Sequence, residues 1–280
     1  MRQQTLREPL AFAGVGLHTG VDANLRLLPA DGGNGRTFRL GGGVAFPALA
    51  EYVVDTRRAT VLGHGGATVS TIEHVMSALL AMEVDNVTLE VDGPEIPVMD
   101  GSSAVFCDAI ARAGLVPQEA CRAPFAIDRP FVFTDGDAVL VVAPSDRLRV
   151  RFAVDYAPPV GSQFIDTTVD AGSYVRDIAP ARTFGYLHEV EALLDAGLAR
   201  GGSLDNALVF APDGPLTPLR WANEVVRHKV LDLLGDFSLL GGHPQLDIVA
   251  VKSGHRLHAR AVTALRAAYP PRPAALGASA

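Results

Sequence analysis

Two parts of this 280-residue chain carry the same succession of predicted elements, and this repeat limits the fold more than any other feature. In each part, strands with alternating apolar residues are followed by a helix, then by a strand, then by a turn with glycine. The helix and strand lie at 70–91 in the first part and at 218–251 in the second. The repeat predicts two similar α+β domains, each with a sheet layer and a helix layer, that arose by duplication. A single larger α+β domain is the alternative.

The predicted domains are separated near residues 121–124, so that they cover 1–122 and 123–270. Within the second domain, 184–210 combine a helix, a glycine stop and a short strand, which indicates an insertion. The residues at 271–280 are rich in Pro and Ala, and we expect them to form a flexible tail.

The composition excludes several classes of protein. Hydrophobic residues make up 48% of the chain, which is enough for a packed core and excludes disorder as the main state. The net charge of −7 argues against a nucleic-acid partner bound through an excess of Lys and Arg. No run reaches about 18 apolar residues, so we expect no membrane span. The two cysteines, Cys107 and Cys121, form no disulfide framework, and we therefore expect a cytoplasmic protein.

A polar stripe on the second predicted helix, 218–234, is the first candidate site. His228 and Asp232 are four residues apart and share a face of the helix, and Asp236 extends this face by another turn. The stripe lies opposite to an apolar one. A His and an Asp placed in this way offer two ligands to a divalent metal ion. The alternative is a solvated helix face without a function.

The first predicted helix, 70–82, offers the further groups that a metal site needs. A catalytic zinc ion takes three protein ligands, and His74 is a candidate for the third. Its neighbour Glu73 is a candidate base that removes a proton from water. Two structural alternatives stay open, because Glu73 can complete a capping box with Ser70 and His74 can be an ordinary, partly buried histidine. His255, at the end of a predicted strand, can protonate a leaving amine or be a polar turn residue.

Six blocks of sequence, in a fixed order along the chain, carry a resemblance to a known family. The blocks are GVGLHTG (14–20), STIEHVMSALLAMEVDNVTLEV (70–91), PEIPVMDGSS (94–103), ARTFGYLHEVEALLDAGLARGGSLDN (181–206), RHKVLDLLGD (227–236) and SGHRLH (253–258). Together they resemble the UDP-3-O-acyl-N-acetylglucosamine deacetylases, zinc amidases that commit Gram-negative bacteria to lipid A synthesis. The resemblance runs from about Gln4 to Leu265. Taken alone, the first block lacks the glycine spacing of a dinucleotide-binding loop.

The resemblance implies a fold, a metal and a set of catalytic residues. The family has two layered α+β domains, each with an insert, and its active site lies in the cleft between them. The implied zinc ligands are His74, His228 and Asp232. The implied catalytic residues are Glu73 as general base, His255 as general acid, Asp236 as the group that orients His255, and Thr183 and Lys229 as groups that stabilise developing charge.

The resemblance also implies how the substrate is held. The family's insert is a βαβ unit that matches 184–210 and forms an apolar passage for an acyl chain. The implied lining residues are Phe184, Val190, Leu193, Ala199, Gly202, Ser203 and Ala207. Tyr156 is implied to stack on uracil and Lys252 to contact the diphosphate. At Pro158 and His258 the chain departs from many members, which have histidine and asparagine there, and these departures leave the nucleotide contacts open.

The implied function is zinc-dependent hydrolysis of the 2-acetamido group of UDP-3-O-(3-hydroxyacyl)-N-acetylglucosamine, with acetate and UDP-3-O-(3-hydroxyacyl)-glucosamine as products. We expect one zinc ion per chain, with Fe2+ as the alternative. We also expect a monomer that acts on a small-molecule substrate and contacts a membrane surface only transiently. Two other functions stay open: a metal-dependent deacetylase of a different N-acyl amino sugar, and a nucleotide-sugar or lipid-binding protein without catalysis.

Overall fold

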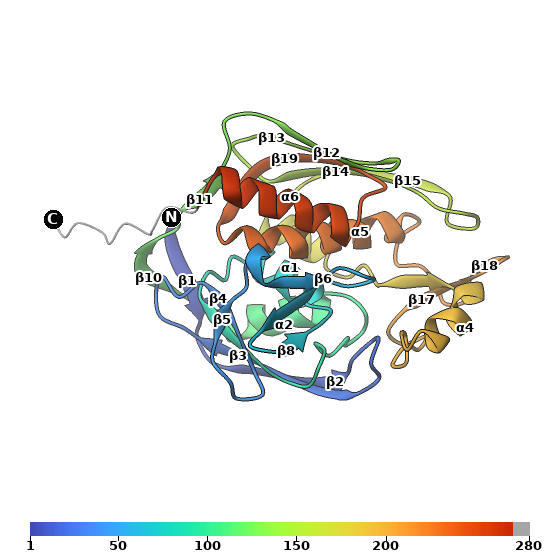
Figure 1. Cartoon of the computed structure of the whole chain (residues 1–280), viewed down its shortest axis with the longest axis horizontal. Helices are drawn as coiled ribbons and strands as arrows, with labels where there is room; N and C mark the ends of the chain where they lie inside the picture. Colours follow the sequence, from blue (N-terminus) through green and yellow to red (C-terminus); the bar gives the residue numbers. More distant parts are fainter. Residues whose placement is uncertain (271–280) are drawn as a thin grey trace.

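The computed structural model describes residues 1–270 and contains two large sheets with helices packed between them (Figure 1). One sheet belongs to the first half of the chain and the other to the second half. The space between the sheets is filled by α1 (Glu73–Ala81) and α2 (Ala104–Ala113) from the first half and by α5 (Glu224–Phe237) and α6 (His255–Ala268) from the second. The predicted α+β fold is therefore confirmed.

The two large sheets share one strand order. The first sheet is ordered β2 (Leu10–Val15), β3 (Asp22–Pro29), β9 (Val87–Asp92), β4 (Arg36–Leu40) and β5 (Phe46–Pro47). The second is ordered β12 (Phe131–Asp135), β13 (Ala138–Pro144), β19 (His243–Val251), β14 (Arg149–Asp155) and β15 (Ser162–Thr168). In both orders the third and fourth strands are parallel and the other neighbours are antiparallel. The order repeats as the predicted duplication requires, while a common origin of the halves stays a prediction.

The strand that ends each repeat alternates between buried and less buried residues, as the sequence pattern predicts. In β9 the buried positions are Val87, Leu89 and Val91. In β19 every second residue from Pro244 to Ala250 is buried. This alternation fixes which face of each sheet turns toward the helices, because a shift by one residue would expose the whole apolar set.

Helices α1 and α5 cross in the centre of the molecule, and their contact packs the first half on the second. Every residue of α1 is buried. The close approach depends on Gly235, because a Cβ atom there would lie only 2.3 Å from the carbonyl oxygen of Glu73. A larger residue at this position would force the two helices apart.

Smaller units surround this central part. One is a three-stranded sheet of β6 (Val53–Asp55), β7 (Val61–His64) and β8 (Ala67–Val69), and a second is made of β16 (Phe184–Tyr186), β17 (Leu208–Ala211) and β18 (Gly214–Pro215). The others are the pair β1 (Arg2–Leu6) and β10 (Leu115–Cys121), helices α3 (Ala171–Asp177) and α4 (Leu187–Asp195), and two short 3-10 helices at Ala50–Tyr52 and Ser238–Leu240. Strand β11 (Pro124–Ala126) is the sixth strand of the second large sheet, because it pairs with β19 in parallel. Strands β16 and β17 are parallel and are joined through α4, which gives a βαβ unit where the insert was predicted. The division into two domains near 121–124 stays a prediction, and the predicted tail at 271–280 lies outside the described residues.

Helix α1 is shorter than predicted, and the predicted capping box is wrong. The helix begins at Glu73, and its N-cap residue is Ile72, which makes no side-chain capping bond. Thr71 has a positive φ of 58°, a conformation that cannot continue into a right-handed helix. Glu73 is therefore not engaged by Ser70, and its carboxylate is available for other contacts.

Helix α5 also begins later than predicted, at Glu224 instead of Pro218. The carboxylate of Glu224 is fully buried and accepts hydrogen bonds from the backbone N–H of Arg220, at 2.6 Å, and from the guanidinium of Arg182, at 2.9 Å. These bonds hold the preceding residues as a loop.

Three helices were not predicted from the sequence. They are α2, α3 and α6. In α6 an apolar stripe that includes Leu257, Val262 and Leu265 packs into the core. His255 is the first residue of this helix, so the interpretation of His255 as a polar turn residue is wrong.

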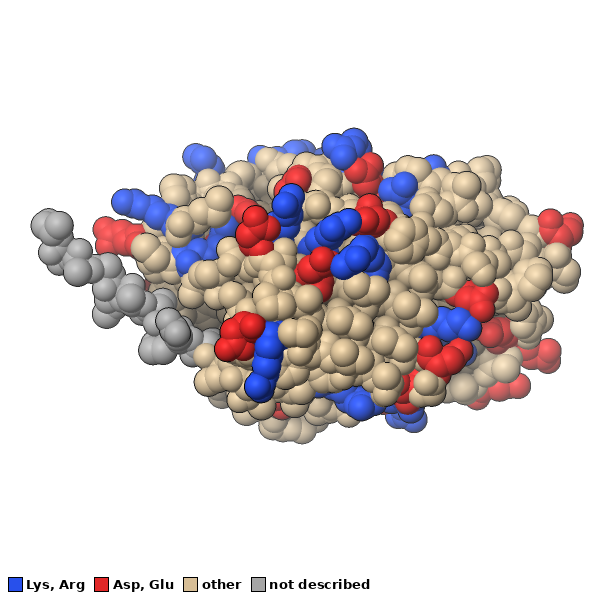
Figure 2. Space-filling view, turned by 90° about the horizontal axis from the view of Figure 1, so that it is seen from above, with Lys and Arg blue, Asp and Glu red and all other residues tan. Residues whose placement is uncertain are grey.

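The outer face of the second sheet carries acidic and basic side chains next to one another (Figure 2). Arg149 pairs with Asp166 at 2.6 Å, and Arg151 pairs with Asp247 at 2.9 Å. This face therefore presents no continuous basic patch. Within residues 1–270, no helix has both the length and the apolar character that crossing a membrane requires.

Candidate metal centre

Helices α1 and α5 bring three predicted ligands together. Each of His74, His228 and Asp232 offers one ligand atom, and these atoms lie within 4.8 Å of one another. The Nε2 atom of His228 lies 3.3 Å from Oδ1 of Asp232. All three side chains are buried, so the interpretation of the α5 stripe as a solvated face is wrong.

The protonation state of His228 suits metal binding. Its Nδ1 atom lies 3.0 Å from the carbonyl oxygen of Ala181. A carbonyl oxygen only accepts, so the ring hydrogen is on Nδ1 and the lone pair is on Nε2, which faces Asp232. Burial lowers the pKa of His228 and keeps the ring neutral.

His74 is also neutral, because burial and the neighbouring His228 lower its pKa to about 3. Its Nδ1 atom is buried and has no hydrogen-bond partner among residues 1–270. Buried polar atoms are seldom left unpaired, because the loss of hydration costs about 1–3 kcal/mol. Two neutral imidazoles, one of them incompletely bonded, and one carboxylate fit the ligand set of a zinc ion.

Asp232 supplies the negative charge of this cluster. Burial opposes its ionisation, but Lys229 outweighs the effect of burial and the pKa of Asp232 is lowered. The Nζ atom of Lys229 lies 2.6 Å from Oδ2 of Asp232, so Oδ1 remains the oxygen nearer to His228. Lys229 is itself buried, and Asp232 raises its pKa.

Glu73 and His255 lie beside the cluster and face each other. Oε1 of Glu73 is 3.8 Å from Nε2 of His255, and His255 Nε2 is 3.9 Å from Oδ2 of Asp232. Burial raises the pKa of Glu73 to about 8, and Asp232 adds to the rise. Burial lowers the pKa of His255, but Asp236 and Glu73 outweigh it and raise the pKa to about 9.

Asp236 orients His255 by binding the Nδ1 side of its ring. Its Oδ2 atom accepts the Nδ1–H of His255 at 2.8 Å and the Nδ1–H of His258 at 2.8 Å. Burial opposes ionisation of Asp236, but His255 outweighs it and lowers the pKa to about 2. The Nε2 atom of His258 lies 2.8 Å from the hydroxyl of Ser253. His258, one of the departures from the family, is thus fully buried and bonded to Asp236.

Thr60 is a site residue that the sequence did not indicate. Its hydroxyl donates to Oδ1 of Asp236, and its backbone N–H donates to Oε2 of Glu73 at 3.2 Å. It lies 13 residues before Glu73, in a loop without a motif. Only the folded chain brings it between the two carboxylates.

The segment before β16 runs along His228. The carbonyl oxygen of Ala181 bonds the ring, and the ring of Phe184 packs edge-on against it with centroids 6.2 Å apart. Thr183 lies between Ala181 and Phe184 in the chain, and its backbone N–H donates to the carbonyl oxygen of Gly101 at 2.8 Å. Tyr156 packs against the other side of Phe184, with centroids 5.3 Å apart.

Lys252 directly follows β19, the middle strand of the second sheet. Its Nζ atom is 3.0 Å from Asp137 and 2.9 Å from Asp155, so two carboxylates already balance its charge. Asp155 directly precedes Tyr156, so the two predicted nucleotide contacts lie close together where the parallel strands β14 and β19 end. Pro158, the other departure, forms a cis peptide bond with Pro159.

The residues implied to line an acyl passage lie in and around the βαβ unit. Val190 and Leu193 lie on α4, which has no buried residue, and both are half-buried. Phe184, Ala199 and Ala207 are half-buried, whereas Gly202 and Ser203 are exposed. A Cβ atom at Gly202 would lie 3.1 Å from the carbonyl oxygen of Ala199, so crowding there comes from the loop's own backbone.

The glycine-rich residues 14–20 bind the loop that contains Gly201 and Gly202. The backbone N–H of Gly201 donates to the carbonyl oxygen of Leu17 at 3.0 Å. Within residues 14–20, the backbone N–H groups of His18 and Thr19 donate hydrogen bonds to the buried carboxylate of Glu95. The residues of the first sequence block therefore connect the βαβ unit to the first half of the chain.

Comparison with known proteins gives one consistent result. A family model described as UDP-3-O-acyl N-acetylglycosamine deacetylase matches residues 3–267. A protein of Nostoc sp. named UDP-3-O-acyl-N-acetylglucosamine deacetylase is 46% identical over 268 residues, which cover 92% of this chain and 96% of the relative. Proteins of the same name from Syntrophotalea carbinolica and Myxococcus xanthus are 45% and 44% identical, over 91% and 93% of this chain and 85% of each relative.

Proposed function

Since this chain belongs to the UDP-3-O-acyl-N-acetylglucosamine deacetylase family, we propose that it hydrolyses the 2-acetamido group of UDP-3-O-(3-hydroxyacyl)-N-acetylglucosamine in lipid A biosynthesis. The products are acetate and UDP-3-O-(3-hydroxyacyl)-glucosamine. The observation that carries the proposal is the convergence of two neutral imidazoles and a carboxylate from α1 and α5, with Glu73 and His255 beside them.

The metal of this proposal is one zinc ion per chain, held by His74, His228 and Asp232. When bound, zinc supplies a Lewis acid that polarises the amide carbonyl and makes water more acidic. The same donor set also suits Fe2+, which is the alternative metal. The bond from His228 to the carbonyl oxygen of Ala181 orients the ring for this task.

Glu73 is the general base that takes a proton from the attacking water. Burial disfavours its carboxylate form, but the imidazolium of His255, 3.8 Å away, favours it. A cation at the neighbouring ligands adds to this preference. The N–H of Thr60 bonds Oε2, which leaves Oε1 free to accept the proton.

His255 is the general acid that protonates the leaving amine. Its raised pKa of about 9 keeps the ring charged at neutral pH, so a proton is ready for transfer. Asp236 binds Nδ1, so the proton that moves is the one on Nε2. This is the side of the ring that faces Glu73 and Asp232.

Thr183 and Lys229 stabilise the negative charge that develops on the carbonyl oxygen. Both lie next to His228, one in the chain segment along its ring and the other beside it on α5. A single donor placed in advance for such an oxyanion contributes about 3 kcal/mol to the rate.

The substrate is held on both sides of this centre. The acyl chain lies along the βαβ unit, where each buried CH2 contributes about 0.8 kcal/mol. The proposed contacts are Phe184, Val190, Leu193, Ala199, Gly202, Ser203 and Ala207 for the chain, and Tyr156 and Lys252 for the nucleotide. We further propose a cytoplasmic monomer that takes its acylated substrate during brief contact with a membrane surface.

Metal analysis combined with an acetate-release assay tests this function. The purified chain is expected to hold about one zinc ion and to release acetate from the acylated UDP-sugar, and His228→Ala is expected to lose both. UDP-N-acetylglucosamine without an acyl chain serves as the comparison substrate. Equal turnover of the two substrates would contradict the acyl-chain contacts, and a fully active metal-free protein would contradict the metal centre.

A further inference from the structure

A cavity lies near the end of α1 that is opposite to His74. It has a volume of about 1010 Å3 and is lined by residues of both halves of the chain. His74 lies in the first turn of α1, whereas the cavity borders the residues that follow the last turn of this helix. The nine residues of α1 separate the two sites by about 12 Å along the helix axis.

Arg36 offers an unused donor in this cavity. Its Nε donates to the carbonyl oxygen of Val84 at 2.9 Å, and its Nη2 donates to that of Leu79 at 3.4 Å. Its Nη1 makes no hydrogen bond to residues 1–270, and no carboxylate of that range lies within 4.0 Å of the guanidinium. Burial lowers the pKa of Arg36 to about 10, and the charge of Asp85 opposes this shift only in part.

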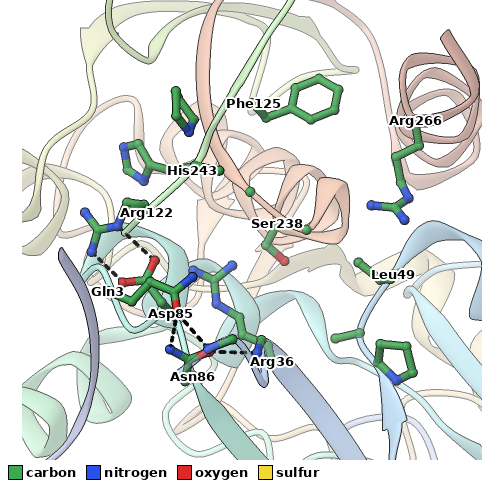
Figure 3. Close-up of a pocket in the computed structure, with 18 of the residues that line it drawn as sticks. Gln3, Arg36, Leu49, Asp85, Asn86, Arg122, Phe125, Ser238, His243 and Arg266 are labelled. Carbon is green, nitrogen blue, oxygen red and sulfur yellow. Dashed lines mark hydrogen bonds and ion pairs between the residues drawn. The ribbon is translucent and has the colours of Figure 1, made fainter. Parts of the chain in front are cut away.

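The carboxylate nearest to Arg36 is already occupied. Asp85 accepts two hydrogen bonds from Arg122, at 2.8 and 2.7 Å, and a third from the backbone N–H of Gln4 at 2.8 Å. Figure 3 shows Arg36 and Asp85 together on one side of the cavity. Asp85 is therefore directed toward Arg122, and the charge of Arg36 remains available.

The rest of the cavity lining combines apolar side chains with polar ones such as Ser238 and His243. Leu49 lies across from Arg36, and Phe125 forms another part of the wall (Figure 3). Arg266, on the same side as Leu49, is paired with Glu51 at 2.8 Å. The cavity thus combines a guanidinium that has no paired carboxylate with apolar side chains, and a small organic anion can use both.

We propose that this cavity binds an organic anion, whose carboxylate or phosphate group bonds Nη1 of Arg36 and whose apolar part packs against Leu49 and Phe125. Guanidinium groups recognise both kinds of anion through charge-assisted hydrogen bonds. Because residues of both halves line the cavity, the bound anion bridges the halves. The site does not depend on the proposed deacetylase function, because it shares no residue with the metal centre.

The reactivity of the Cys121 thiol can report whether a ligand occupies the cavity. It is exposed and lines the cavity, whereas Cys107 is buried. Alkylation of Cys121 by iodoacetamide in the full-length, metal-bound protein is followed by mass spectrometry, and Cys121→Ser identifies the labelled thiol. Octanoate and octyl phosphate are expected to slow the reaction in a saturable way, and the stronger of the two identifies the preferred head group. Octanol, which lacks the charge, is expected to have little effect.

Two variants test the role of the charge. Arg36→Gln is expected to raise the octanoate concentration for half-maximal protection by about tenfold or more. Leu49→Glu places a negative charge on the opposite wall and leaves the bonds of Arg36 to Leu79 and Val84 in place, and it is expected to abolish protection even if Arg36→Gln fails to fold. Arg149→Gln, on the outer face of the second sheet, is the matched control and is expected to behave as the wild type.

Three results would overturn the proposal. The first is unchanged protection in Arg36→Gln or Leu49→Glu. The second is protection by octanol equal to that by octanoate, which would make the cavity a purely apolar site. The third is the absence of protection by both anions.

Discussion

The crossing of α1 and α5 and the βαβ unit around α4 are built in different ways. At the crossing, the polar residues are almost fully buried, and the two helices touch at Gly235. In the βαβ unit, α4 has no buried residue, and a Cβ atom at Gly185 would meet nothing within 4 Å. One region is therefore rigidly packed, whereas the other is open at its surface.

This difference matches the two tasks that the proposed function assigns. Groups that move a proton must keep their positions to within fractions of an ångström, and dense packing of two helices provides this. A surface that accommodates an acyl chain needs only apolar area, and it tolerates changes in side chains. Mutations at the crossing are therefore expected to affect chemistry and stability together, and mutations in the βαβ unit to affect substrate binding alone.

The largest effect is expected for Gly235→Ala. The new Cβ atom would lie 2.3 Å from the carbonyl oxygen of Glu73, so α1 must move and carry His74 away from His228. We expect loss of bound metal and of turnover, and a decrease in the free energy of unfolding by about 1–3 kcal/mol. Metal analysis, acetate release and denaturant unfolding measure the three effects.

Gly185→Ala is the matched control for this substitution, because its Cβ atom meets no neighbour. We expect a change in unfolding free energy within about 0.5 kcal/mol and an unchanged metal content. If both glycine variants kept their metal and activity, the contrast between the two regions would be wrong.

The second largest effect is expected for Glu73→Gln. The amide keeps the size of the side chain but cannot take up a proton, so turnover should fall by about 10²–10⁴-fold. Because Glu73 is not among the proposed ligands, the metal content should stay unchanged. Loss of metal together with turnover would mean that Glu73 acts by holding the cluster and not as a base.

The sequence predicts those site residues that follow a regular spacing, and it misses those that depend on contacts between distant parts of the chain. The α5 residues His228, Asp232 and Asp236 were found because helical spacing places them on one face. The same spacing cannot tell a buried face from a solvated one, since that depends on what α1 covers. Thr60 escaped prediction because its contacts to Glu73 and Asp236 connect residues that are far apart in the sequence, in a loop without periodicity.

The fold shows the same difference between local patterns, which the sequence predicts, and contacts between distant residues, which it does not. The strands that close the two repeats, predicted to end at 91 and at 251, end at Asp92 and at Val251, because a period of two arises from the strand itself. The start of α1 was placed too early because Ser70 and Glu73 have the spacing of a capping box. The positive φ of Thr71 overrides this local pattern, and it is stabilised by a hydrogen bond from the Thr71 hydroxyl to the buried Glu95 at 2.7 Å.

A smaller effect is expected at His258, which lies on α6 and bonds Asp236 but is not one of the proposed catalytic residues. His258→Ala removes one of the two histidine bonds to Asp236, so His255 becomes less well oriented. We expect kcat to fall by about tenfold with KM unchanged, by analogy with other groups that orient catalytic side chains indirectly. His258→Asn keeps a donor and should restore most of kcat. Equal losses in both variants would indicate a packing role only.

The smallest effect is expected for Leu193→Ala on α4. Leu193 is half-buried, so the substitution should remove about 1 kcal/mol of contact with an acyl chain and raise KM about fivefold, with kcat unchanged. The effect should be present with a long acyl chain and absent with a short one that does not reach α4. Leu194→Ala, one position along on an exposed side chain, is the control and should leave both KM values unchanged. A fall in kcat in Leu193→Ala would show that α4 contributes to the chemistry, and the separation of the two regions would then fail.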